Sequence, residues 1–304
     1  MNKYRKMIMD GLQKRHPECE IRIERVRKNN GYSYEGIVVR TDVNNDNICE
    51  SVLPCQLYEK ALEDGEMALE DILDEMEEQI KRKPVINLIQ FLDYEQIKDN
   101  LCIRVINYER NKETLEDVPH QKYLDLAVVC YVLIPLPNEG MQARMLVNNA
   151  LLGLWNIGES KLMRTAVYNT FHAVRVRIRK MGDVIAAIAR REGIIIPEQI
   201  LDTTDEYLYV ADLGTNGGGA ACILMKEVFK ELAERNGCDL YIIPSSVYEL
   251  IVILKIDDRH DDSAHIRSMV QEVNQTAVEE EDVLSDHVYL YQRETNEIVD
   301  LFKG

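Results

Sequence analysis

The stretch that decides the fold runs from Tyr207 to Leu254 and reads YLYVADLGTNGGGAACILMKEVFKELAERNGCDLYIIPSSVYELIVIL. Tyr207 to Ala211 is an aromatic and β-branched run, which predicts a strand. From Ala220 to Ala233, apolar residues recur at the spacing of a helix, and Gly237 is predicted to end it in the left-handed conformation. Leu240 to Ile243 and Val247 to Leu254 then read as strands, and only three residues separate them. Such a short link predicts an antiparallel hairpin, because parallel strands would need a crossover.

The glycine-rich segment between the first strand and the helix also has the position of a phosphate-binding loop. However, it contains no Gly-Lys-Ser/Thr, and its glycines do not fit Gly-x-Gly-x-x-Gly before the helix. We therefore interpret Gly214 to Gly219 as a flexible turn.

The rest of the chain extends the same mixture of helices and strands. One face of a predicted amphipathic helix carries Leu69, Ile72, Leu73, Met76 and Ile80, and the acidic residues between them are expected to form its solvated face. The apolar spacing from Val174 to Ile188 also predicts helix. Asn30-Gly31 is a turn pair that predicts a two-residue β-hairpin between Glu20–Lys28 and Tyr32–Arg40. Leu124 to Ile134 is apolar almost throughout, so it is predicted to be a central strand covered on both faces. These patterns predict an α+β fold, with mostly antiparallel sheets and helices packed on them. Polar residues near 200 suggest two regions, 1–200 and 201–304, and a single domain is the alternative.

Composition limits the function classes. The 304 residues include 36 Lys and Arg against 53 Asp and Glu, which gives a net charge of −17 and disfavours binding to nucleic acid or anionic membranes. No signal peptide or membrane-spanning run is visible. The seven cysteines are an odd number without CxxC pairs, so we expect reduced thiols in a cytoplasmic protein.

The densest polar cluster of the sequence lies between residues 104 and 125. Its members are Arg104, Asn107, Glu109, Arg110, Asn111, Asp117, His120 and Asp125. A histidine among carboxylates could perform acid–base chemistry or bind a ligand, but the spacing matches no standard metal motif. The structural alternative is a turn in which Asp117 bonds to backbone amides.

Two further polar positions stand out near the C-terminal half. Asp286-His287 with Ser245 or Ser246 has the residue types of a catalytic triad, but the GxSxG elbow is absent. Neighbouring side chains of a strand also point to opposite faces, so Asp286 and His287 are not expected to act as a relay. Glu249 interrupts an apolar strand, so we expect it to face solvent, to pair with Arg104 or Arg110, or to accept hydrogen bonds near Ser245.

Several islands of the sequence resemble an uncharacterised bacterial family, the domain of unknown function 5688, which is common in gut Firmicutes. They include KNNG at 28–31, INYERNKETLEDVPH at 106–120, DLA at 125–127, DLYIIPSSVYE at 239–249, and EVNQT with VLSDHVYLY at 272–291. Two positions depart from the family pattern: FHAVRVRI follows Asn169-Thr170, and Tyr248 stands where the family often has His. The resemblance implies a shared fold and a cytoplasmic setting, and it implies no activity.

We expect a soluble, non-enzymatic interaction or regulatory protein with an unidentified protein partner. The alternative is a small-ligand-binding protein or enzyme that uses the Arg104–Asp125 cluster. Its candidate ligand-binding residues are Arg104, Asn107, Glu109, Arg110, Asp117, His120, Glu249 and His287. No catalytic residue, metal ligand or cofactor is predicted, and the oligomeric state is left open. If the candidate residues converge, the ligand-binding hypothesis gains; if they scatter, it loses.

Overall fold

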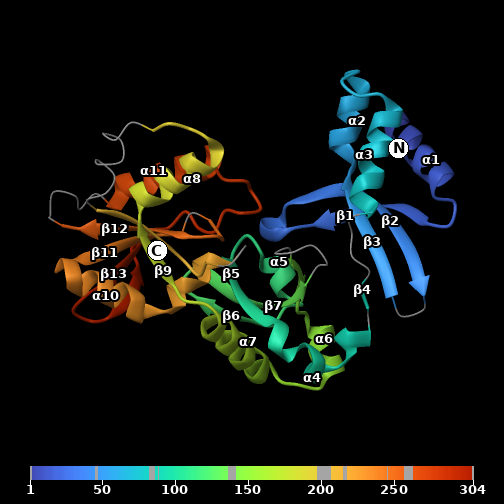
Figure 1. Cartoon of the computed structure of the whole chain (residues 1–304). Helices are drawn as coiled ribbons and strands as arrows, with labels where there is room; N and C mark the ends of the chain where they lie inside the picture. Colours follow the sequence, from blue (N-terminus) through green and yellow to red (C-terminus); the bar gives the residue numbers. More distant parts are fainter. Residues whose placement is uncertain are drawn as a thin grey trace. The chain divides into compact units, whose positions relative to one another are not determined.

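The computed structural model describes residues 2–44, 47–81, 86–87, 89–135, 142–196, 207–214, 218–244, 246–256 and 263–302. The chain divides into two compact units (Figure 1). Unit 1 consists of residues 1–98 and 134–143, and unit 2 consists of residues 99–133 and 144–304. The predicted boundary near residue 200 falls outside the described residues. Among the helices that the structure describes, none is both long and apolar enough to span a membrane.

Unit 1 is a four-stranded antiparallel sheet in the order β1-β2-β3-β4 with helices packed on it. The strands are β1 (Glu20–Arg27), β2 (Ser33–Asn44), β3 (Asn47–Pro54) and β4 (Ile86–Asn87). The helical segments are α1 (Lys3–Arg15), α2 (Cys55–Glu63), α3 (Leu69–Lys81), η2 (Ile89–Leu92) and α4 (Tyr94–Ile97). A further turn, η3 (Lys98–Asn100), lies where the two units divide.

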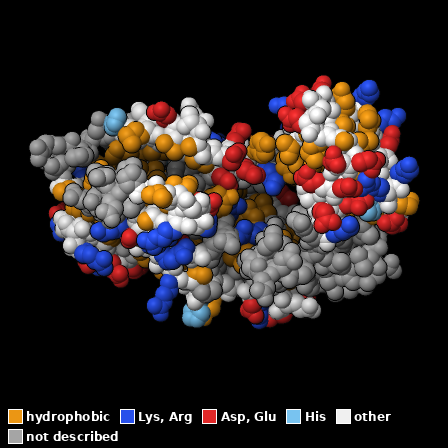
Figure 2. Space-filling model, turned by 45° about the horizontal axis from the view of Figure 1, so that its top comes forward, with side chains coloured by type: hydrophobic (Ala, Val, Ile, Leu, Met, Phe, Trp, Pro, Cys, Tyr) orange, Lys and Arg blue, Asp and Glu red, His pale blue; other side chains and the backbone are white. Residues whose placement is uncertain are grey.

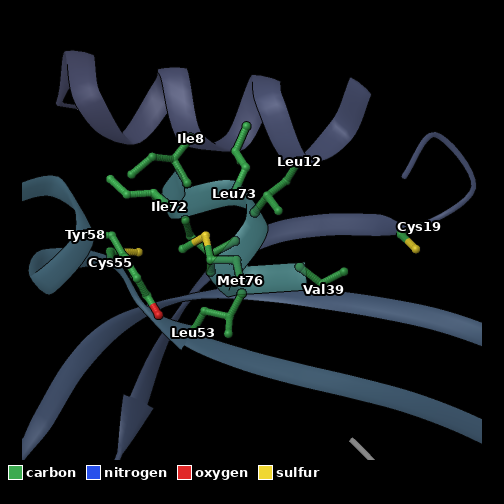
Figure 3. Packing of buried hydrophobic residues seen from close by; sticks show 11 residues of the cluster. Ile8, Leu12, Cys19, Val39, Leu53, Cys55, Tyr58, Ile72, Leu73 and Met76 are labelled. Carbon is green, nitrogen blue, oxygen red and sulfur yellow. The ribbon is translucent and has the colours of Figure 1, made fainter. Parts of the chain in front are cut away.

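The core of unit 1 forms where α1 and α3 cross the sheet. Figure 3 shows Ile8 of α1 and Ile72 of α3 pointing into the same cluster, above Leu53 of β3. The helices approach closely, because a Cβ atom on Gly11 would lie 2.6 Å from a methyl carbon of Leu73. Every fourth or third residue of each helix therefore reaches the core, as the apolar spacing of the sequence predicts.

The β1–β2 hairpin is confirmed, but its turn is longer than predicted. Arg27 pairs with Ser33, and the Lys28 amide donates to the Tyr32 carbonyl oxygen at 2.7 Å. The loop therefore has three residues, which form the turn η1 (Asn29–Gly31). Asn30 and Gly31 both have positive φ, at 60° and 72°. Two successive residues in this region favour Asn and Gly, which explains the pair although the loop length was wrong.

Unit 2 contains two sheets. The first has the order β5-β7-β6, with β8 also paired to β7; its strands are β5 (Leu101–Asn107), β6 (His120–Tyr123), β7 (Leu126–Pro135) and β8 (Gln142–Leu146). The predicted central strand is therefore β7, and residues Leu126 to Cys130 of it are buried. The second sheet has the order β14-β13-β11-β12-β10-β9. Its strands are β9 (Arg177–Lys180), β10 (Leu208–Asp212), β11 (Asp239–Ile243), β12 (Leu250–Lys255), β13 (Tyr289–Gln292) and β14 (Glu297–Asp300).

Helices cover both faces of the six-stranded sheet. The helical segments of unit 2 are α5 (Lys112–Leu115), α6 (Asn149–Trp155), α7 (Glu159–Ala173), α8 (Met181–Glu192), η4 (Gly219–Leu224), α10 (Lys226–Asn236) and α11 (Ser263–Thr276). On one face, α11 packs through Val270 against Tyr241 and Ile243 of β11. On the other face, Phe229 of α10 lies 6.3 Å from the ring of Tyr291. Figure 1 shows α10 and α11 on opposite sides of this sheet.

The stretch that opened the sequence analysis has the predicted order with two corrections. The single helix predicted from Ala220 is divided into η4 and α10, because Met225 leaves the helical conformation at φ −101° and ψ 78°. Strand β12 begins at Leu250, so Glu249 lies in the connection before the strand and not inside it. The antiparallel hairpin of β11 and β12 is confirmed, as is the left-handed residue Gly237 after the helix.

One element was predicted wrongly. The run from Val174 to Ile188 has helical spacing, but Arg177–Lys180 forms the edge strand β9. Arg177 pairs with Asp212 of β10, and the Arg177 and Arg179 side chains both donate to the Asp212 carboxylate, at 2.6 and 2.7 Å. Pairing with a distant strand therefore overrides the local pattern here.

Candidate functional site

Distant segments of unit 2 converge on the residues that lead into β13. The Asn107 side chain at the end of β5 donates to the Leu284 carbonyl oxygen at 2.9 Å. Asn274 of α11 donates to the Ser285 carbonyl oxygen at 2.9 Å, and the Ser285 amide donates to the Pro244 carbonyl oxygen at 2.9 Å. The backbone at Leu284–Ser285 is therefore fixed by β5, by α11 and by the connection after β11.

The same segment binds Asp125, which lies in the turn between β6 and β7. The Ser285 hydroxyl donates to Asp125 Oδ2 at 2.6 Å, and the Tyr289 hydroxyl donates to Asp125 Oδ1. Burial, with the nearby Asp125 carboxylate as the second cause, raises the pKa of Tyr289 well above its ordinary value. Both hydroxyls therefore act as neutral donors that set the orientation of the Asp125 carboxylate.

His287 stands between Asp125 and a second carboxylate, Asp300 at the end of β14. Its Nδ1 donates to Asp300 Oδ2 at 2.8 Å and lies 3.8 Å from Asp125 Oδ2. The other oxygen of Asp300 accepts from the Phe302 amide at 2.9 Å. These three side chains, which we call the Asp125–His287–Asp300 cluster, have potential ligand atoms that all lie within 4.8 Å of one another.

The cluster is shielded and lacks a permanent positive charge. The exposed fractions of the side chains are 15% for Asp125, 26% for His287 and 3% for Asp300. Within the described part of the chain, no lysine or arginine nitrogen lies within 4.0 Å of either carboxylate. Shielded carboxylates need a cation, a proton or many hydrogen-bond donors, so this arrangement can hold a positively charged ligand.

Asp286 faces away from the cluster, as the predicted divergence of neighbouring side chains requires. It accepts from Arg110 at 3.0 Å and from Asn274 at 2.8 Å. Arg110 in turn lies next to Asn107, whose side-chain oxygen accepts from the Arg110 amide at 2.9 Å. The segment Leu284–His287 therefore brings together three residues of the predicted set. Asn107 and Arg110 contact it on one side, and His287 points to the other side.

Arg104 and Glu249 lie elsewhere in unit 2. The guanidinium carbon of Arg104 lies 5.9 Å from the centre of the Tyr248 ring. Glu249 is half-buried and accepts from the Ser246 hydroxyl at 3.0 Å. Ser246 therefore directs its proton to Glu249 and not to His287, and Ser245 lies outside the described residues.

The remaining predicted residues have local roles. Glu109 is exposed and pairs with Lys112, and the exposed Asp117 accepts through its carbonyl oxygen from the Asn149 amide at 2.9 Å. His120 donates through Nδ1 to the Val118 carbonyl oxygen at 2.8 Å, and its ring lies 5.8 Å from that of Tyr108. Each of these contacts is made within the polar cluster's own segment or with the start of α6.

Sequence reasoning missed Asp300, Ser285, Tyr289 and Asn274 as parts of the site. A signal existed for three of them, because EVNQT contains Asn274 and VLSDHVYLY contains Ser285 and Tyr289. These islands were already marked by resemblance to the family, as was Asp125 in DLA. Asp300 lies in an ordinary alternating strand and carried no signal of its own.

Comparison with known proteins gives one result. No curated protein and no solved structure matches the chain. The model of a protein family, described as a family of unknown function, matches residues 1–293. This match covers unit 1 and all of unit 2 except its last residues, which include β14, and it agrees with the resemblance of the sequence islands. The chain belongs to the family of unknown function DUF5688.

Proposed function

We propose that this protein is a binding protein that takes up a divalent metal ion in the Asp125–His287–Asp300 cluster. The observation that carries the proposal is that one imidazole nitrogen and two carboxylates, from three separate segments, meet within 4.8 Å. Hydrogen bonds from Ser285 to Asp125 and from the Phe302 amide to Asp300 orient both carboxylates. Such outer contacts are typical of metal ligands, whose orientation they fix.

The distances suit a metal ion. Ligand atoms about 2.0–2.2 Å from an ion lie about 3.0–3.5 Å from one another, for octahedral and tetrahedral geometries respectively. The separations of 2.8 and 3.8 Å from His287 Nδ1 to the two carboxylates bracket this range. Each carboxylate oxygen has two acceptor sites, so the hydrogen bonds from Ser285 and from the Phe302 amide leave room for an ion. The ion replaces the hydrogen bond between His287 Nδ1 and Asp300, because neutral His287 binds it through the Nδ1 lone pair and carries its proton on Nε2 instead.

The charge balance favours a cation as well. With neutral His287 the cluster has two negative charges, and with protonated His287 it has one. Because Asp300 is almost completely shielded, water can compensate little of this charge. One nitrogen with two oxygens is a set that Zn²⁺ and Mn²⁺ accept, whereas Mg²⁺ and Ca²⁺ prefer oxygen ligands throughout.

A binding role fits this site better than catalysis. The Ser285 hydroxyl, which lies nearest to His287 in sequence, donates to Asp125 and is completely buried, so it is not presented as a nucleophile. A bound ion would instead connect the β6–β7 turn to the C-terminal hairpin. This supports a regulatory protein whose conformation responds to a metal ion, in the cytoplasmic setting that the sequence suggests.

The test is metal binding by the full chain after treatment with a chelator. Mn²⁺ binding is followed by the electron paramagnetic resonance of the unbound ion, and Zn²⁺ binding by calorimetry. We expect the wild type to bind either ion and Asp300→Asn to bind it at least about 10-fold more weakly. The matched control is Asp286→Asn, which makes the same charge change one residue from His287 but on the other side of the segment.

Binding should also raise the melting temperature. A ligand at about 100 times its Kd stabilises the native state by about 2.7 kcal/mol. The proposal is wrong if the folded wild type binds neither ion, or if Asp300→Asn and Asp286→Asn bind with the affinity of the wild type.

A further inference from the structure

A second group of metal-ligand side chains lies in unit 1, in the turn that follows α1. His16, Glu18 and Cys19 come from four consecutive residues, and their ligand atoms lie within 4.8 Å of one another. Glu18 Oε1 is 3.8 Å from His16 Nδ1, and it accepts from the Cys19 thiol at 3.7 Å. None of these residues takes part in the cluster of unit 2.

The turn is braced by its backbone. The His16 amide donates to the Leu12 carbonyl oxygen at 2.8 Å, which ends α1, and the Cys19 amide donates to the His16 carbonyl oxygen at 3.2 Å. The Gln13 side chain donates to the carbonyl oxygens of both His16 and Cys19, each at 3.2 Å. The three ligand side chains are therefore held close together before any ligand arrives.

The second nitrogen of His16 supplies an independent observation. His16 Nε2 is buried and has no hydrogen-bond partner among the described residues, yet Glu77 Oε1 of α3 lies only 3.6 Å from it. Histidines that bind a metal through one nitrogen usually donate from the other nitrogen to a carboxylate. A metal at Nδ1 would leave the proton on Nε2, where it points toward Glu77 and needs only a small closure to form the bond.

The surroundings carry excess negative charge. The acidic face of α3 was predicted to be solvated, and Glu70 and Asp74 are indeed exposed. Together with Glu77 they contact Arg15, and Lys81 also lies 3.7 Å from Glu77. Figure 2 shows Asp and Glu side chains gathered on unit 1. Three carboxylates with two cations, and the Glu18 carboxylate beside His16, leave a net negative field that attracts a cation.

We propose that His16, Glu18 and Cys19 form a zinc site, with Glu77 as the carboxylate that orients His16. Nitrogen, oxygen and sulfur are the ligands that Zn²⁺ takes in tetrahedral sites, where neighbouring ligand atoms are about 3.5 Å apart. The thiol proton is released to solvent when the thiolate binds the ion. Three protein ligands leave the fourth position for water or for a side chain of a partner.

The alternative role for Cys19 is that of a core residue. It is buried, and it packs at the edge of the unit 1 core. Figure 3 shows it beside the loop that precedes β1, away from Met76 at the centre of the cluster. Its place at this edge gives the sulfur access to the turn, which a thiol in the centre of the core lacks.

The experiment is a titration of the reduced, metal-free full chain with Co²⁺ as a spectroscopic substitute for Zn²⁺. A thiolate ligand produces a sulfur-to-cobalt charge-transfer band in the near ultraviolet, and the unit 2 cluster, which has no sulfur, does not. We expect the band in the wild type and its loss on addition of excess Zn²⁺. Cys19→Ser should abolish it, and Glu77→Gln should weaken Co²⁺ binding by about 10-fold.

Two controls keep the result specific. Cys238→Ser removes a half-buried thiol outside the proposed site and should leave the band unchanged. Glu18→Gln removes a proposed ligand and should weaken Co²⁺ binding. Glu20→Gln makes the same charge change two residues away and should leave Co²⁺ binding unchanged. The proposal is overturned if the folded wild type shows no band or if Cys19→Ser keeps it. Asp300→Asn should not alter the band, so this result is independent of the proposed function in unit 2.

Discussion

The two candidate metal sites differ in how the chain assembles them. In unit 1, His16, Glu18 and Cys19 come from a single turn. In unit 2, Asp125, His287 and Asp300 come from the β6–β7 turn, the approach to β13 and the end of β14. The first set is brought together as soon as one local turn forms, whereas the second is brought together only when both described sheets of unit 2 have formed. A site of the second kind reports the folded state of its whole unit.

The largest expected effect comes from a close backbone contact that unit 2 needs. A Cβ atom on Gly219 would lie 1.9 Å from the Tyr248 carbonyl oxygen and 3.1 Å from Asp212 Cβ. Gly219→Ala must therefore move backbone, and we expect it to destabilise unit 2 by about 3 kcal/mol or more. Urea unfolding followed by the fluorescence of Trp155, the single tryptophan of the chain, measures this in unit 2.

The control for this prediction is Gly153→Ala in α6. Among the described residues, no atom beyond its chain neighbours and its own helix backbone lies within 4 Å of the position of its Cβ, so the change should stabilise the helix by about 0.5–1 kcal/mol. Equal midpoints for Gly219→Ala and the wild type would show that η4 does not approach Tyr248 so closely.

The next effect compares the two histidines directly, in metal-free protein. His287→Ala removes the hydrogen-bond donor of the almost completely shielded Asp300 carboxylate, and leaving such a buried group without its partner costs about 2–3 kcal/mol. His16→Ala removes contacts with Glu18 and Glu77 at 3.8 and 3.6 Å, which are worth about 1 kcal/mol or less. Thermal unfolding followed by circular dichroism provides both values. Similar losses for the two variants would contradict the distinction between a local and a long-range cluster.

The sequence predicted the features that depend on neighbouring residues. The spacing of Ile72, Leu73 and Met76 predicted the buried side of α3, and Gly237 marked the end of α10. Strand β9 was missed because a run of four residues fits both the spacing of a helix and that of a strand, and only pairing with β10 decides between them. Propensity and spacing describe one segment at a time, so they cannot specify which segments pair.

The Asp125–His287–Asp300 cluster was likewise predicted only in part. Asp125 and His287 were recognised as unusual polar residues, but their meeting was not predicted. Asp300 completes the cluster because β14 pairs with β13, where Asp300 lies opposite Tyr289. That register, and the packing of the β6–β7 turn against it, depend on contacts across about 160 residues of chain, as the Asp125–Ser285 bond shows. Isolated residue types therefore identified candidates, and only the fold identified the site.

Alkaline pH should affect two thiols of unit 2, those of Cys102 on β5 and Cys130 on β7. Burial is the main cause that raises the pKa of Cys102 to about 11 and that of Cys130 to about 12, from 9.0. The neutral thiols are favoured by folding, so their contribution is complete below about pH 9 and is lost as the pH rises through 11 to 12. The urea midpoint reported by Trp155 should therefore fall between about pH 8 and about pH 11. Cys130→Ala should show a shallower fall, and an identical slope would mean that Cys130 is not responsible.

The smallest effect concerns the β1–β2 turn of unit 1, where the conformation is again local. Gly31 has a φ of 72°, a region that a β-branched residue adopts only with strain. Gly31→Val should destabilise unit 1 by about 1–2 kcal/mol. Gly31→Asn keeps a residue that tolerates this region and should cost a few tenths of a kcal/mol. Because the strain is confined to the turn, Gly31→Val should lower the melting temperature without changing the urea midpoint that Trp155 reports for unit 2. A fall in that midpoint would show that the units unfold together, and then the local character of unit 1 would not extend to its stability.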